Sequence, residues 1–138
     1  MGNGMNQQAS DDAAPARICV VDDDAAVRQA MANLLQADGY ATLLFDSGES
    51  FLASPHLPHI DLVLLDVKLR GINGFTTQER FAAMGLDTPL LFVSGHSDRD
   101  MALRASRAGA LALLRKPVDP DLLFEHIECA LSTRKRPG

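Results

Sequence analysis

The sequence lacks three features that would point to particular protein classes: paired cysteines, a long apolar run and an excess of basic residues. Its two cysteines, Cys19 and Cys129, have no CxxC spacing and no histidine in register, which favours buried reduced thiols over a disulfide or a zinc site. No apolar run approaches the roughly 20 residues that cross a bilayer, and the N-terminus carries acids and amides where a signal peptide needs a basic start. We therefore expect a cytoplasmic protein without a membrane span.

The net charge of −5 argues against the broad basic surface that nucleic-acid binding usually requires. A small basic cluster, Arg134 to Arg136, is the exception near the C-terminus. We expect any action on DNA to go through something other than this chain's own surface.

The 138 residues are enough for one domain with a real core, and the 46% apolar and 22% charged content is that of an ordinary globular chain. Residues 1–15 lack periodicity and predict a flexible leader. Residues 16–132 then form a single folded domain, and residues 133–138 form a basic tail or the start of a linker.

Within the folded domain, short apolar runs alternate with amphipathic helical patterns. The expected strands cover 18–21, 40–45, 62–65, 89–93 and 111–114. The expected helices cover 24–37, a short segment opened by Ser47, then 75–84, 98–107 and 119–131. Five strand–helix units of this kind predict an α/β fold, a flavodoxin-like doubly wound parallel sheet with strand order 2-1-3-4-5.

Acidic residues follow two strands that this order makes neighbours. Asp22 and Asp23 come directly after the first strand, and Asp66 comes directly after the third. Because adjacent strands lie about 4.8 Å apart, three carboxylates would share one small volume. Two carboxylates about 5 Å apart repel by roughly 3 kcal/mol at an effective dielectric near 20, so the site needs a cation or a raised pKa. Mg²⁺ suits such oxygen ligands, with Mn²⁺ as a substitute.

Two further side chains end strands at the same edge of the sheet: Ser94 after the fourth strand and Lys116 after the fifth. Both types of side chain bind phosphoryl oxygens. Together with a metal, they would neutralise a phosphoryl group from three sides while a carboxylate attacks it.

These four motifs resemble the pattern of response-regulator receiver domains from bacterial two-component systems, over about residues 17–131. The family pattern is an acid pair after strand one, an acceptor aspartate after strand three, a Ser or Thr after strand four and a Lys-Pro pair after strand five. The matching positions are Asp22-Asp23, Asp66, Ser94 and Lys116-Pro117. The details of the Val-Ser-Gly stretch are similar to receivers that are often joined to helix-turn-helix DNA-binding domains.

The resemblance implies a role for each residue. Asp66 would accept the phosphoryl group from a histidine kinase or a phosphotransfer protein, and Lys116 and Ser94 would contact its oxygens. Asp22, Asp23, Asp66 and the backbone carbonyl of Lys68 would surround Mg²⁺. The bond between Lys116 and Pro117 would be cis. The chain would be a signalling switch, not an enzyme, controlling an output such as transcription.

Two departures from the family pattern affect these expectations. Arg70 and Ile72 stand where the family commonly has proline and methionine, which predicts a less rigid loop after Asp66. Leu113 replaces the aromatic switch residue, so the output should depend more on the loop from Ser94 to Asp98 and on the helix 98–107. A homodimer would use segments 98–107, 111–114 and 119–131.

Other interpretations remain for single features. Asp22 to Asp24 alone could be a solvated turn with Asp24 as a helix N-cap. An aspartate-nucleophile phosphatase would need an acid at Lys68, and a flavin-binding module would need a phosphate-binding turn after the first strand. The loop histidines His56, His59 and His96 have no partner in sequence and are assigned no role. The chain is either a stand-alone receiver or the N-terminal part of a longer regulator.

Overall fold

The computed structural model describes residues 14–95 and 99–134. Most of the predicted leader, His96, the predicted helix start at 98 and the tail 135–138 lie outside these residues. The described chain forms five strands: β1 (Arg17–Val21), β2 (Ala41–Phe45), β3 (Leu62–Asp66), β4 (Leu90–Ser94) and β5 (Ala112–Arg115). The helices are α2 (Ala25–Ala37), α3 (Gly48–Leu52), the 3-10 turn η1 (Leu57–His59), α4 (Gly74–Ala82), α5 (Arg99–Arg107) and α6 (Pro120–Arg134).

All neighbouring strands are parallel, and the sheet has the order β2-β1-β3-β4-β5, which confirms the predicted topology. β3 and β4 are buried along their whole length. They lie at the centre of the sheet and are covered by helices on both faces, which is why their sequences are continuously apolar up to the last residue. The register pairs Val21 with Leu65 and Asp66 with Val93, so the strand ends that carry the predicted site are level with each other.

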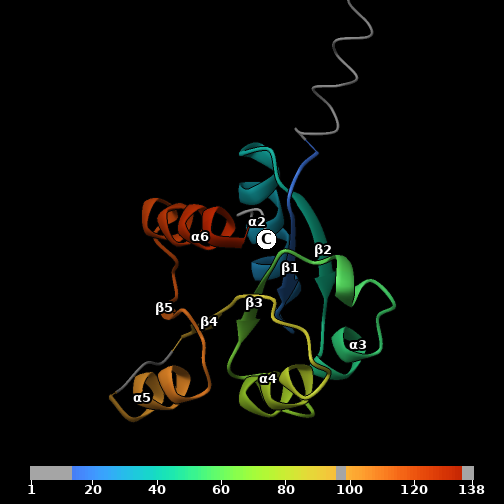
Figure 1. The fold of residues 1–138 in the computed structure, drawn as a ribbon. Helices are drawn as coiled ribbons and strands as arrows, with labels where there is room; N and C mark the ends of the chain where they lie inside the picture. The colour runs from blue at the N-terminus through green and yellow to red at the C-terminus, as the bar shows by residue number, and fades with distance from the viewer. Residues whose placement is uncertain (1–13, 96–98, 135–138) are drawn as a thin grey trace, which may run out of the picture.

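The helices cover the sheet from two sides (Figure 1). α2 and α6 lie on one face, and α3, α4 and α5 lie on the other. A hydrophobic cluster fills each interface. The first contains Met31 and Leu35 of α2 with Leu123 and Ile127 of α6. The second is built around four phenylalanines, Phe51, Phe75, Phe81 and Phe92.

Capping residues fix where the helices begin. Asp24 accepts hydrogen bonds from the N–H groups of Ala26 and Val27, as predicted for the N-cap of α2. The side chain of Ser47 caps α3 by accepting from the N–H of Ser50. Asn73 caps α4 in the same way, so this helix begins one residue before the predicted start.

Several boundaries and burial assignments differ from the sequence-based expectation. β4 and β5 are shifted by one residue toward the C-terminus, which makes Ser94 the last residue of a strand, and α6 continues three residues past the predicted end at Leu131. Cys19 is buried as predicted, but the prediction was wrong for Cys129, which is exposed on α6. Leu122, an apolar residue of this helix, is 43% exposed. The apolar stripe of α6 is therefore narrower than its composition suggests.

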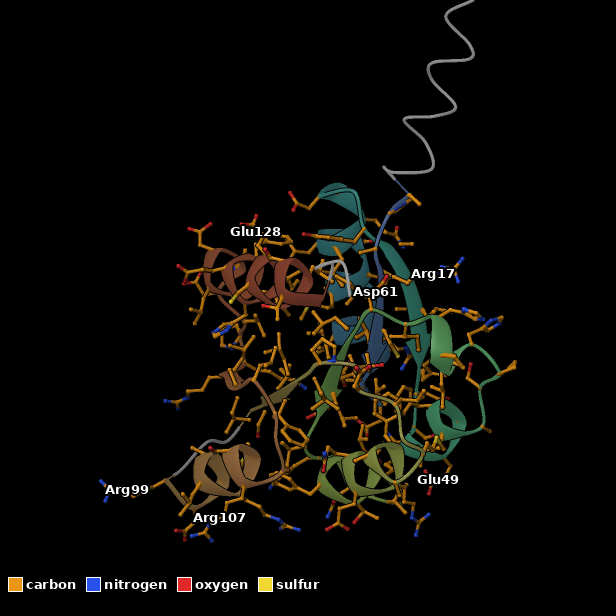
Figure 2. All side chains as sticks on the ribbon, viewed as in Figure 1. Arg17, Glu49, Asp61, Arg99, Arg107 and Glu128 are labelled. Carbon is orange, nitrogen blue, oxygen red and sulfur yellow. The ribbon has the colours of Figure 1, made fainter. Side chains whose placement is uncertain are left out.

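Figure 2 shows all described side chains on the same view, with charged residues such as Glu49, Arg99 and Glu128 on the outside of the layers. In the described part of the chain, no helix is both long and apolar enough to span a bilayer.

Candidate phosphoryl and metal site

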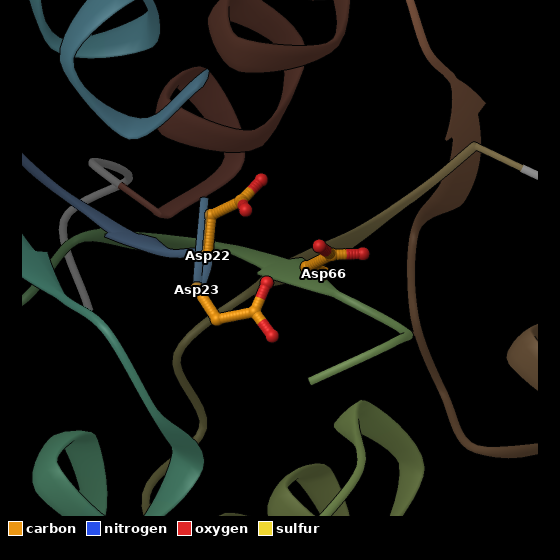
Figure 3. Close-up of side chains that lie close together, drawn as sticks. All are labelled: Asp22, Asp23 and Asp66. Atoms are coloured by element: carbon orange, nitrogen blue, oxygen red, sulfur yellow. The ribbon is translucent and has the colours of Figure 1, made fainter. Parts of the chain in front are cut away.

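Three carboxylates meet at the carboxyl ends of β1 and β3. Asp22 and Asp23 directly follow β1, and Asp66 is the last residue of β3. Each offers a carboxylate oxygen, and these oxygens all lie within 4.8 Å of one another. The three side chains point toward one volume (Figure 3). The structure thus brings together the predicted acidic cluster.

Lys116 joins the two buried members of this cluster. Its Nζ lies 2.9 Å from Asp22 Oδ2 and 3.0 Å from Asp66 Oδ2. The side chains of Asp22 and Asp66 are 6% exposed and that of Lys116 is 23% exposed. We call Asp22, Asp66 and Lys116 the inner half of the site. An ammonium shared between two carboxylates offsets part of their repulsion at the point where water is least able to do so.

The inner half shifts the protonation equilibria of its members. Burial raises the pKa of Asp66; the hydrogen bond from Lys116 acts against this rise, and the negative charge of Asp22 adds to it. Burial alone would lower the pKa of Lys116, but its hydrogen bonds to Asp22 and Asp66 and the negative charges of these two residues together outweigh burial, so the pKa is raised. The lysine therefore stays charged at neutral pH.

Asp23 is more exposed than Asp22 and Asp66, and it contacts Arg70. The backbone N–H of Arg70 donates to Asp23 Oδ2 over 3.0 Å, and Arg70 Nε lies 3.8 Å from the same oxygen. The Asp23 side chain is 24% exposed and the Arg70 side chain 88% exposed. We call Asp23 and Arg70 the outer half of the site.

The remaining predicted residues lie close to the cluster. Lys68 is exposed, and its backbone N–H donates to Asp66 Oδ1 over 3.2 Å. Ser94 is fully buried at the end of β4, where its carbonyl accepts from the N–H of Lys116 over 2.8 Å. The bond from Lys116 to Pro117 is cis, as the family resemblance implied. The metal role of the Lys68 carbonyl stays a prediction.

Some supporting contacts could not be found by sequence reasoning. Arg28 Nη1 donates to the backbone carbonyl of Asp22 over 2.7 Å, and so ties α2 to the end of β1. Gly74 lies so close to β3 that a Cβ there would be 2.3 Å from the carbonyl oxygen of Asp66. A glycine at the start of an amphipathic stretch is the one signal that could have indicated the close approach. No local pattern marks the arginine.

The loop between β3 and α4 is also held from α3. Glu49 Oε2 accepts a hydrogen bond from the N–H of Ile72 over 3.1 Å. The positions that depart from the family pattern, Arg70 and Ile72, therefore both donate backbone N–H groups to carboxylates. The prediction of a less rigid loop is not tested by these contacts, but they show how the loop is anchored.

An apolar cavity of about 450 Å³ opens beside the inner half of the site. Asp22, Asp66 and Lys116 line one end, and α2 contributes aliphatic side chains including Val27 and Met31. The polar groups of the inner half thus face a wall with few competing hydrogen-bond partners, which strengthens their mutual attraction.

A doubly wound parallel sheet with three acids and a lysine at its carboxyl edge matches one family of known proteins. Residues 18–128 match the model of the response regulator receiver domain. The chain is 36% identical over 116 residues to the transcriptional regulatory protein FixJ of Bradyrhizobium diazoefficiens, covering 83% of this chain and 56% of FixJ. It is 32% identical over 114 residues to the response regulator protein TodT of Pseudomonas putida, covering 83% of this chain and 50% of TodT.

A solved structure agrees. The CheY-like receiver domain protein of Methanospirillum hungatei superposes with a TM-score of 0.79 at 27% identity, covering 91% of this chain and all of that one. The chain therefore belongs to the response regulator receiver domains of two-component systems. It spans about half the length of FixJ and TodT.

Proposed function

We propose that this receiver domain accepts a phosphoryl group on Asp66 and that the modified site controls an output such as transcription. The observation that carries the proposal is the contact of Lys116 with both Asp66 and Asp22 at 3.0 and 2.9 Å. It places a cation beside the carboxylate that would attack. The name of FixJ, a transcriptional regulatory protein, supports an output of this kind.

The chemistry is the transfer of a phosphoryl group from a phosphorylated donor to the unmodified Asp66 carboxylate. An oxygen of the ionised Asp66 carboxylate attacks phosphorus, a P–O bond forms, and the bond to the donor breaks. With a phosphohistidine donor, the histidine nitrogen keeps the electron pair of the P–N bond and takes up a proton. Water later attacks the acyl phosphate and releases inorganic phosphate, which restores Asp66.

The residues present fit a hard divalent cation. Three carboxylates with oxygens within 4.8 Å of one another supply oxygen ligands only, which suits Mg²⁺ or Mn²⁺. Asp22, Asp23 and Asp66, with the backbone carbonyl of Lys68, would hold the ion, and its charge would offset that of the phosphoryl oxygens. These four ligands are the ones that the family resemblance implies.

Lys116 and Ser94 have separate roles in this proposal. Lys116 already contacts the acceptor carboxylate, so its ammonium would stabilise charge on a transferred phosphoryl group. Ser94 ends the neighbouring strand and is tied to Lys116 through the backbone, so its hydroxyl would bind another phosphoryl oxygen. The phosphoryl donor would be a sensor histidine kinase or a phosphotransfer protein.

An aspartate-nucleophile phosphatase is less well supported. Such an enzyme needs an acid two residues after the nucleophile, and Lys68 occupies that position with its backbone N–H bound to Asp66. The site is therefore proposed as a switch that takes part in its own phosphorylation and dephosphorylation.

Mass spectrometry after incubation with acetyl phosphate and Mg²⁺ tests the acceptor. We expect one added phosphoryl group on the wild type and none on Asp66→Asn. Asp46→Asn is the matched control, because Asp46 follows β2 at the same edge of the sheet and is exposed; it should be phosphorylated normally. A modified Asp66→Asn protein would show that another residue is the acceptor.

We further propose that the phosphorylated domain dimerises through α5, β5 and α6. Leu103 on α5, Leu111 just before β5 and Leu122 on α6 are each 43–51% exposed. α5 carries Arg99 and Arg107, and α6 carries Glu128 (Figure 2), so two copies could pair opposite charges. Sedimentation with beryllofluoride and Mg²⁺ should show a dimer that Leu103→Asp abolishes. Met84→Asp, an equally exposed control on another surface, should leave it intact.

A further inference from the structure

In the β3–α4 loop, Arg70 contacts Asp23 of the acidic cluster. Its backbone N–H and its guanidinium both approach Asp23, and both reach the same oxygen, Oδ2. The two contacts differ in kind. The N–H···O distance of 3.0 Å is a full hydrogen bond, whereas the Nε···O distance of 3.8 Å is an ion pair between partly hydrated groups.

We propose that Arg70 is a positioning residue for Asp23 and sets the affinity of the site for a divalent cation. The proposal rests on the metal site proposed above. Its backbone N–H holds one Asp23 oxygen, so that the carboxylate stays directed at the cluster. Its guanidinium places a positive charge beside that carboxylate and so lowers the attraction of the cluster for the divalent cation.

The two contacts have opposite effects on cation binding. An oriented carboxylate loses less conformational freedom when it becomes a ligand, so the hydrogen bond favours binding. The guanidinium charge repels the incoming cation and opposes binding. The Arg70 side chain is 88% exposed, so salt screens this repulsion. Its energy should therefore be as small as the interaction energy of exposed ion pairs. The charge and the hydrogen bond can be separated because one belongs to the side chain and the other to the backbone.

Four substitutions at this position separate the contributions. Arg70→Gln removes the charge and keeps the N–H, and we expect Mn²⁺ to bind about two- to fivefold more tightly at low ionic strength. Arg70→Glu should bind more tightly still, and Arg70→Lys should restore the wild-type affinity because it keeps the charge. Arg70→Pro removes the charge and the N–H together, so its affinity should fall below that of Arg70→Gln.

The measurement is Mn²⁺ titration by electron paramagnetic resonance, with Mg²⁺ as competitor, on the full chain at low and high salt. Arg80→Gln is the matched control: it makes the same change in net charge at an exposed position on α4, and its Mn²⁺ affinity should equal that of the wild type. High salt should reduce the difference between Arg70→Gln and wild type. Circular dichroism would establish that every variant is folded.

The outcomes distinguish the two proposals. If Asp23→Asn leaves Mn²⁺ binding unchanged, the proposed metal site is wrong. If Asp23→Asn weakens binding but Arg70→Gln matches wild type at low salt, the site stands and the role of the Arg70 charge is refuted. Equal affinities for Arg70→Pro and Arg70→Gln would refute the positioning role of the backbone N–H.

Discussion

The inner and outer halves of the site use the same chemistry, a carboxylate beside a basic side chain, in different surroundings. Asp22 and Asp66 are 6% exposed and share Lys116, whereas Asp23 is 24% exposed and faces an arginine that is 88% exposed. Charge interactions strengthen as water is removed and weaken as solvent and salt screen them. The inner half should therefore determine the stability of the site, and the outer half should adjust its ion binding.

The largest expected effect concerns the backbone under each half. Gly74→Ala would place a Cβ 2.3 Å from the carbonyl oxygen of Asp66 and 2.8 Å from Val67 Cα, and neither backbone atom can rotate away. We expect a loss of about 3 kcal/mol in the free energy of unfolding, measured by urea titration in EDTA. Gly71→Ala, next to Arg70, meets the flexible Glu49 carboxylate and a φ of +77°, and should lose about 1 kcal/mol. Equal losses would contradict the distinction.

The next largest effect is expected when the basic side chain of each half is replaced. Lys116→Met leaves two buried carboxylates without their shared ammonium, and we expect a loss of about 2 kcal/mol in EDTA, below the cost for a fully buried pair because Lys116 is 23% exposed. Arg70→Met, the same change in the outer half, should cost less than about 0.5 kcal/mol. Urea titrations at neutral pH measure both. A loss for Arg70→Met as large as that for Lys116→Met would show that exposure does not separate the halves.

A smaller effect comes from Asp66, the proposed acceptor. The raised pKa of Asp66 means that protonation favours the folded state: this contribution is present below the pKa of the unfolded chain and is lost as pH rises through the folded-state pKa. Asp66→Asn removes the buried charge, so in EDTA at pH 7 it should be more stable than wild type by roughly 1 kcal/mol. The gain should shrink as pH falls toward 3.8, the ordinary pKa of aspartate.

Urea titrations in EDTA, at pH 7 and at lower pH, measure this gain, and Asp23→Asn is the outer counterpart in the same experiment. It should change stability in EDTA by less than about 0.5 kcal/mol at either pH, because its carboxylate is partly hydrated. A destabilised Asp66→Asn protein at neutral pH, or a gain that grows on acidification, would contradict the assigned pKa direction.

The two halves also differ in how far the sequence could predict them. Asp22, Asp23, Asp66, Ser94 and Lys116 were found because strand ends can be read from apolar runs, and parallel strands bring their ends to one edge. The bridging of Asp22 and Asp66 by Lys116 depends on the register of β5 against β4, which no local pattern determines. The Arg70 contact depends on a loop path, and the Gly74 approach depends on how α4 packs under β3.

The smallest expected effect tests whether the phosphoryl signal spreads beyond both halves. Leu113 on β5 is paired in register with Phe92 of β4 and packs, partly buried, against the phenylalanine-rich cluster. An aromatic ring at this position could move between buried and exposed rotamers and bias the switch by up to a few kcal/mol; leucine has less area and no polar tip.

We therefore expect beryllofluoride with Mg²⁺ to shift amide resonances of α5 in the wild type, but less than in Leu113→Tyr. Nuclear magnetic resonance spectra of both proteins, with Asp66→Asn as the unresponsive control, measure the difference. Changes confined to the residues around Asp66, with none in α5, would show that the signal stays within the site; larger α5 shifts in the wild type than in Leu113→Tyr would show that the leucine does not limit it.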